Sequence, residues 1–156
     1  MAQPDTSPSP VVVVGVDGSE SSVEAARWAC EQARLTGSRL EVISAWQEAG
    51  AWGMSWGMAI PIPSDFDPAG DTRTMLDGIV AALAGAAPSV TIDTLVVEGN
   101  PAEVLVEASG HARLLVVASR GHGQFSGMLL GSVSQHCAAH AHCPVVIVRP
   151  QTAEPG

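Results

Sequence analysis

The residues best suited to chemistry lie in a glycine-rich stretch, VASRGHGQFSGMLLGSVS, at residues 117–134. Its glycines are Gly121, Gly123, Gly127 and Gly131. Glycine lets backbone N–H groups approach an anion with no Cβ in the way, and the helix expected to begin at Ser132 adds unpaired N–H groups, a favourable dipole and a hydroxyl. The stretch therefore predicts a phosphate-binding loop. The alternative is a plain strand-to-helix connection that needs its glycines only for turning.

This stretch fits neither of two common phosphate motifs. The chain contains no Gly-Lys pair, which excludes a P-loop. Gly121-x-Gly123 is followed by Ser126 where the dinucleotide fingerprint requires glycine, and it follows the fourth expected strand rather than the first.

A hydrolase-like pattern occurs elsewhere, at Gly53-Met54-Ser55-Trp56-Gly57. A nucleophile elbow needs a strand directly before it and a helix directly after it, and this segment offers neither. A catalytic serine is therefore not expected. The whole segment 46–68, rich in Trp, Met, Gly and Pro, could be a lid over a ligand, a surface for a partner, or ordinary packing of a long crossover.

Histidines and cysteines cluster at residues 136–143. His136 and His140 are four residues apart and, with Cys143, could share a metal ion. The alternative is a polar helix face whose cysteines pack as small apolar residues, and we favour it because no carboxylate lies nearby in the sequence.

The elements that must position these residues alternate between strand and helix. Apolar runs predict buried strands at 11–16, 39–46, 90–97, 113–119 and 144–148. Capping and stop signals predict helices at 19–35, 71–86, 100–110 and 132–140. We therefore expect a single doubly wound α/β domain with a five-stranded parallel sheet and helices on both faces. Ligands bind such sheets beyond the carboxyl ends of the strands, which would gather the turns at Asp17, Trp46 and Arg120.

Composition narrows the function further. With 46% hydrophobic residues and 15% charged ones, the 156-residue chain suits one buried sheet, placed here at residues 11–150 between a flexible lead-in at 1–10 and a tail at 151–156. Seven basic residues against 16 acidic ones, a net charge of −9, argue against nucleic-acid partners and an anionic membrane surface. The N-terminus lacks signal-peptide features, and the three cysteines lack disulfide spacing, so a cytoplasmic location is expected.

Two motifs resemble those of the universal stress protein family over residues 11–149. They are the opening VVVVGVDGSESS and the ending Gly121-x9-Gly131-Ser132 followed by a PVVIV strand. The family's nucleotide-binding members carry G-x2-G-x9-G-[ST] after the fourth strand, and here Ala118 replaces the first glycine. The added methyl group could crowd a phosphate or have no effect, because alanine keeps its backbone N–H.

The resemblance implies strand order 3-2-1-4-5 and an ATP site. Asp17 would hydrogen-bond the ribose or the adenine edge; this aspartate could equally be a turn residue that closes the first loop. The expected nucleotide-binding residues are Asp17, Ser44, Ala45, Val117, Ala118, Ser119, Arg120, Gly121, Gly131, Ser132 and Val133. Backbone at Ser44 and Ala45 would meet the adenine. Mg²⁺ or Mn²⁺ would bridge the phosphates, and no protein residue is assigned as a ligand of the ion. A homodimer would form through the last strand, Val145–Val148.

The resulting expectation is an ATP-binding stress-response regulator with slow or no hydrolysis, because no residue has the position of a general base. Two alternatives stay open. One is a nucleotide-independent homodimeric interaction protein in which Ala118 marks a degraded site. The other is an adenylating enzyme, which would need a second pocket in segment 46–68.

Overall fold

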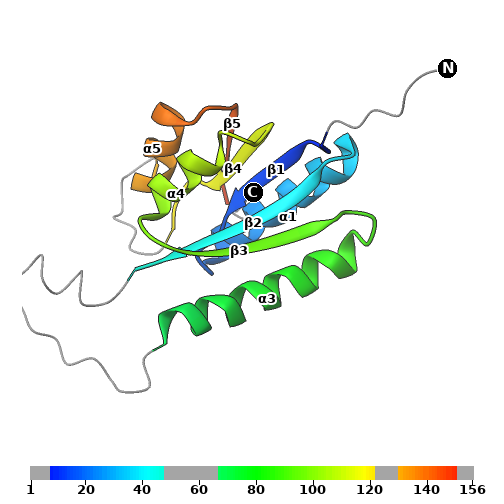
Figure 1. Ribbon diagram of the computed structural model, residues 1–156, viewed down its shortest axis with the longest axis horizontal. Coiled ribbons are helices and arrows are strands. Elements are labelled where there is room, and N and C mark those ends of the chain that lie inside the picture. Colours follow the sequence, from blue (N-terminus) through cyan, green and yellow to red (C-terminus); the bar gives the residue numbers. More distant parts are fainter. Residues whose placement is uncertain (1–7, 48–66, 122–129, 151–156) are drawn as a thin grey trace, which may run out of the picture.

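A five-stranded parallel sheet forms the centre of the molecule (Figure 1). The computed structural model describes residues 8–47, 67–121 and 130–150. The strands are β1 (Val11–Gly15), β2 (Arg39–Trp46), β3 (Ile92–Glu98), β4 (Leu114–Ala118) and β5 (Val145–Val148). They lie in the order β3-β2-β1-β4-β5, each paired in parallel with its neighbours. The predicted fold class and strand order are confirmed.

Helices cover both faces of the sheet (Figure 1). They are α1 (Glu20–Thr36), α3 (Pro68–Ala86), α4 (Pro101–Ala108) and α5 (Ser132–His140). Helices α1 and α3 pack on one face, and α4 and α5 pack on the other.

Local signals explain where the helices begin and end. The Ser19 side chain accepts the N–H of Ser22 at the start of α1, and Gly37 ends this helix in the left-handed conformation with φ of 64°. Helix α3 begins at Pro68, about one turn before the predicted start at Asp71. The reason is that the carboxylate of Asp67 caps the helix by accepting the Gly70 N–H at 3.0 Å, with proline in the first helical position.

The third strand, by contrast, begins at Ile92, after its predicted start at Val90. Val90 donates its N–H to the Ala87 carbonyl at 3.1 Å, which makes a turn of the residues before Ile92. The other strands agree with their predicted ranges to within one residue at each end.

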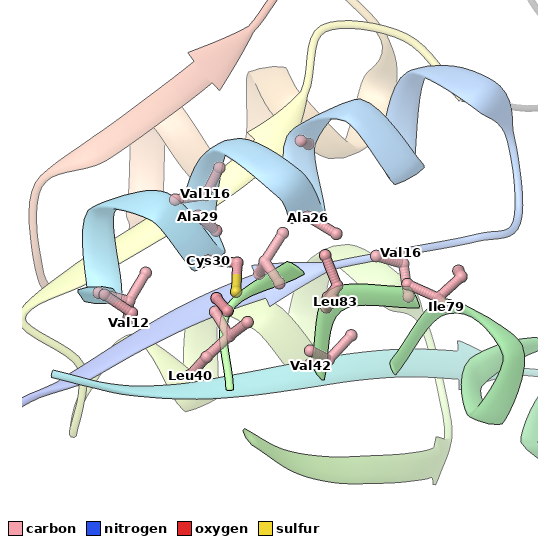
Figure 2. Packing of buried hydrophobic residues seen from close by; sticks show 14 of the residues in the cluster. Val12, Val16, Ala26, Ala29, Cys30, Leu40, Val42, Ile79, Leu83 and Val116 are labelled. Carbon is pink, nitrogen blue, oxygen red and sulfur yellow. The ribbon is translucent and has the colours of Figure 1, made fainter. Parts of the chain in front are cut away.

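Two apolar clusters hold the layers together, one on each face of the sheet. Figure 2 shows the cluster on the α1 and α3 face, where strand residues such as Val12 and Leu40 meet Ala26 and Ala29 of α1 and Leu83 of α3. The small alanines let α1 lie close to the sheet. The side chains at the alternate strand positions point to the other face, where they form the second cluster beneath α4 and α5.

This topology fixes where a ligand can bind. Strands β1 and β4 are neighbours, although β1 leads to β2 on one side and β4 leads to β5 on the other. The crevice beyond their carboxyl ends is therefore the switch point of the sheet.

Within the ranges described, none of the helices has the length and apolar character needed to cross a membrane.

Two features of the sequence lie outside the described residues. The Gly53–Gly57 pattern falls in residues 48–66, and Gly123 and Gly127 fall in residues 122–129.

Candidate functional site

A cavity of about 400 Å³ opens at the switch point of the sheet. Its size is in the range of small-molecule sites. The described residues that line it are Gly15, Val16, Asp17, Ser22, Ile43, Ala45, Pro101, Val104, Leu105, Val117, Ala118, Arg120, Gly121, Gly131, Ser132, Val133 and Ser134. They come from the ends of β1, β2 and β4 and from the first turns of α1, α4 and α5.

Nine of the eleven residues expected at a nucleotide site line this cavity; Ser44 and Ser119 do not. Both serines are buried, each with 2% of its surface exposed. Ser44 alternates with Ile43 and Ala45 along β2, so its side chain lies on the opposite face of the strand. Ser119 has a structural role, because its carbonyl accepts the Gly131 N–H at 2.7 Å.

That bond joins the two ends of the glycine-rich stretch. The hydroxyl of Ser134 reinforces it by donating to the carbonyls of Ser119, at 3.2 Å, and Gly131, at 3.0 Å. The first turn of α5 is therefore held beside the end of β4.

The N-terminus of α5 differs from those of the other described helices. Its cap residue, Gly131, makes no side-chain hydrogen bond to the helix, whereas Ser19, Asp67 and Asn100 cap α1, α3 and α4. The first intrahelical bond runs from the Gln135 N–H to the Gly131 carbonyl at 3.0 Å. The N–H groups of the residues between them are thus available to an anion in the cavity.

Asp17, just after β1, lies close to Gly121, just after β4. The Asp17 carboxylate accepts the Ser19 N–H at 2.9 Å, and the Asp17 N–H donates to the Ser22 hydroxyl at 3.3 Å. A Cβ at Gly121 would overlap this carboxylate. Position 121 therefore requires glycine while Asp17 keeps its place.

Only two charged side chains, Asp17 and Arg120, lie among the described lining residues. The sequence contains no Lys or Arg between Arg120 and Arg149. An anion at the α5 end would therefore rely on backbone N–H groups, the hydroxyl of Ser132 and one guanidinium.

The α4 side of the cavity was missed in the sequence. Pro101, Val104 and Leu105 were read only as part of a helix, and no local pattern shows that its first turns reach the switch point. One signal existed: Gly15 interrupts the valine run of β1 because Leu105 lies against it, with its Cδ1 atom 2.5 Å from where a Cβ would be.

The metal cluster considered at residues 136–143 does not assemble. The rings of His136 and His140 lie 4.5 Å apart, but in the portion of the chain described here no three His, Cys, Asp or Glu side chains are placed to hold a metal ion. Cys143 instead donates its thiol to the Pro144 carbonyl at 3.4 Å, and Cys137 is fully buried. Both cysteines pack in or against the apolar cluster beneath α4 and α5.

The family model of the universal stress proteins matches residues 10–149, nearly the whole of the folded chain. The chain belongs to the universal stress protein family.

Several curated relatives within the family come from mycobacteria. Universal stress protein Rv2623 of Mycobacterium tuberculosis is 36% identical, over 96% of this chain and 47% of its own length. A universal stress protein of Mycolicibacterium smegmatis is 35% identical, over 90% of this chain and 46% of its own length. This chain thus spans about half the length of the curated relatives it matches.

Two solved universal stress proteins share the fold over nearly their full length. One, crystallised in complex with cAMP, is 30% identical with a TM-score of 0.64, and the match covers 91% of this chain and 98% of that one. Another, from Archaeoglobus fulgidus in complex with dAMP, is 19% identical with a TM-score of 0.63, and the match covers 90% of this chain and 97% of that one. At 19% identity, the similarity to the dAMP complex shows only that the two proteins share a fold.

The universal stress protein motif departs from its glycine pattern at Ala118. This residue lines the cavity and also packs against the apolar cluster beneath α1 and α3. Helix α5 lies on the other face of the sheet. The methyl group of Ala118 therefore packs on the face of the sheet opposite the α5 N-terminus.

Proposed function

We propose that this universal stress protein binds an adenine nucleotide, ATP in the first instance, as a regulatory ligand in the stress response. The observation that carries the proposal is the cavity itself, which joins an apolar wall to an uncapped helix N-terminus beside a glycine. An apolar wall suits a purine ring, and a helix N-terminus suits phosphate.

The apolar half would hold the adenine. Ile43, Val104 and Pro101 line this half, together with Ala45 near the end of β2. Strand β1 leaves the sheet after the bond from the Val16 N–H to the Ile43 carbonyl at 2.9 Å. The β2 backbone at Ala45 is therefore free to form hydrogen bonds with a base edge on that side.

The polar half would hold the ribose and phosphates. The Asp17 carboxylate accepts ribose hydroxyls, while the backbone at Gly121 and the first turn of α5 bind the phosphates. Ala118 packs its methyl group against the cluster beneath α1 and α3, so this group does not lie on the α5 side of the sheet.

A divalent cation fits this donor set. ATP carries about four negative charges at neutral pH, and the cavity opposes them with Arg120 alone among its described charged groups, beside the like-charged Asp17. Mg²⁺ or Mn²⁺ would supply the missing positive charge by bridging the phosphates, and Asp17 is the nearest carboxylate for the ion or its water shell. We therefore expect triphosphate binding to depend on the cation more than monophosphate binding does.

Hydrolysis is expected to be slow or absent. Within the described lining, Asp17 is the sole carboxylate, and it already accepts the Ser19 N–H; no histidine or cysteine lines the cavity there. A general base poised toward an attacking water is thus missing from this part of the site. The nucleotide acts as a ligand that is bound and released.

The assembly we propose is a homodimer in a reducing, cytoplasmic compartment. Strand β5 is at the edge of the sheet, and all four of its residues are partly exposed. The three cysteines, Cys30, Cys137 and Cys143, are free thiols, as is usual where disulfides are not maintained.

Isothermal titration with ATP, with and without Mg²⁺, tests the nucleotide proposal. Wild type should bind with micromolar affinity, and Gly121→Val should lose at least tenfold, because the new side chain displaces Asp17. The matched control is Gly78→Val, at a helical glycine with no atom within 4 Å of the new Cβ, which should bind like wild type. A folded wild type, stripped of carried-over nucleotide, that binds no ATP would favour the nucleotide-independent interaction protein instead.

A further inference from the structure

Leu105 and Gly15 lie against each other where both line the cavity. A Cβ at Gly15 would lie 2.5 Å from Cδ1 and 3.0 Å from Cδ2 of Leu105. The isobutyl group of Leu105 therefore occupies the space that a side chain at position 15 would take. Leu105 lines the cavity, yet only 4% of its surface is exposed.

Three neighbouring strand positions surround this leucine. Gly15 of β1 is in register with Ile43 of β2, and the pairing of Val14 with Val116 places Gly15 beside Val117 of β4. Ile43, Val117 and Leu105 belong to one buried cluster. Leu105 thus lines the cavity beside the Gly15 backbone, at the centre of the sheet.

Leu105 belongs to the apolar half of the cavity. Val104 and Pro101, on the same first turns of α4, line the adjoining wall, whereas the uncapped N–H groups and Arg120 lie at the α5 and β4 end. Nothing polar in the Leu105 side chain can recognise a ligand, so its influence is steric. It sets how deep a flat ring can enter.

We propose that Leu105 is the specificity-determining residue of this site, and that it restricts the site to purines without a bulky substituent. The proposal rests on the proposed function, since it assumes that a purine nucleotide enters the cavity. Shortening Leu105 to alanine would open the cavity down to the Gly15 backbone and create a hole for an added group. The reverse change, Gly15→Ala, would push Leu105 into the cavity.

The test uses ATP and three analogues that carry their added group on different edges of the purine: N6-benzyl-ATP, 2-methylthio-ATP and 8-bromo-ATP. Wild type should bind ATP and reject at least one analogue by tenfold or more. Leu105→Ala should bind a rejected analogue at least tenfold more tightly than wild type does, while still binding ATP.

Two results would overturn the proposal. One is a Leu105→Ala variant that binds ATP and rejects the same analogues as wild type. The other is a wild type that accepts all three analogues as well as ATP. A wild type that binds no ATP at all would instead contradict the proposed function, so the two failures can be told apart.

Controls separate this effect from general loosening of the core. Leu83→Ala removes an equally buried leucine, 3% exposed, from the cluster on the opposite face, and it should gain no analogue binding. If Leu105→Ala does not fold, ATP binding by the milder variant Leu105→Val and by Gly15→Ala tests the proposal instead. Gly15→Ala should weaken ATP binding at least fivefold, and Gly15→Ala combined with Leu105→Val should restore most of it; failure of that rescue would contradict the proposal.

Discussion

In the proposed nucleotide complex, Arg120 is the residue on which phosphate recognition depends most strongly through charge. It lines the cavity at the end of β4, and the following 28 residues of the sequence contain no other Lys or Arg. The rest of the phosphate cradle consists of backbone N–H groups and hydroxyls, which are weaker partners for a triphosphate than a guanidinium is.

Replacing Arg120 with glutamine should therefore lower ATP affinity about tenfold, equivalent to about 1.4 kcal/mol. Adenosine, which has no phosphate, should bind both proteins equally. Titration calorimetry of the two ligands measures the difference, and Arg73→Gln on the exposed face of α3 is the control. An equal loss for ATP and adenosine would show that Arg120 supports the fold of the site instead of binding phosphate.

Cys137 gives the molecule an alkaline limit to its stability. Burial raises the pKa of this thiol from 9.0 to about 11. The folded state therefore keeps a proton that the unfolded state loses between these values, so the stabilisation is complete below pH 9 and is lost as the pH rises through 11. The chain contains no Tyr and no Lys, and so few other groups titrate in this window.

The free energy of unfolding of wild type should thus fall between pH 9 and pH 11 by about 2 kcal/mol more than that of Cys137→Ala. Urea denaturation at a series of pH values measures both proteins. Parallel pH profiles would mean that the buried thiol ionises without cost in the folded state.

At the residue scale, the sequence predicts which residue types lie near the cavity better than it predicts the direction in which each side chain points. Gly121, Gly131 and Ser132 were expected at the site because their chemistry is local, and all three line the cavity. Ser44 and Ser119 were expected at the cavity and are buried beside it, since the face of a strand on which a side chain lies depends on its neighbours. Leu105 could not be found, because its role follows from a long-range contact with Gly15.

Among the elements, α4 supplies the apolar wall of the cavity, and the stability of this helix depends on its Asn100 cap. The Asn100 side chain accepts the N–H groups of Ala102 at 2.9 Å and Glu103 at 3.3 Å. The helix has only eight residues, so the cap stabilises a large part of its length.

Asn100→Ala should cost about 1 kcal/mol of unfolding free energy. Because Asn100 itself does not line the cavity, ATP affinity should change less than threefold once the protein is folded. Chemical denaturation and ATP titration of the same variant check both statements, with Asn100→Asp as the variant that keeps a cap. A cap mutant of unchanged stability would show that packing alone holds α4.

The elements themselves were largely predictable from the sequence. Buried strands appear as uninterrupted apolar runs, and the Asn100-Pro101 pair marks the start of α4. The predicted start of α3 is a turn late because the Asp67-Pro68 signal adjoins the Trp-, Met- and Pro-rich sequence before it, which shows no helical periodicity. Strand order came from family resemblance, because strand patterns alone do not tell which strands pair.

For the molecule as a whole, the edge strand β5 is the surface expected to join two copies. Leu115 donates its N–H to the Pro144 carbonyl, and Ser119 donates to the Val148 carbonyl. Alternate residues of β5 therefore direct their backbone groups to β4, and those of Val145 and Ile147 face away from the sheet. This outer row can pair with the same row of a second copy.

Ile147→Pro removes one outward N–H without breaking the bonds to β4, so it should convert a dimer to a monomer while ATP binding is retained. Sedimentation velocity at tens of micromolar protein measures the change, and Ile147→Val, which keeps the N–H, should remain dimeric. A monomeric wild type, or a variant that stays dimeric, would place the interface elsewhere or exclude it.

The most direct test of the account is a titration of ¹⁵N-labelled protein, stripped of nucleotide, with ATP and Mg²⁺ while backbone amide resonances are followed. We predict that the amides of Gly121, Ser132 and Val133 move most and saturate at micromolar affinity, since these N–H groups border the cavity at the α5 N-terminus. Amides at the far end of the sheet, such as that of Arg39, should not move. Saturating ATP that leaves the three cavity amides unmoved in folded protein would contradict the claim that this universal stress protein holds a nucleotide at the switch point of its sheet.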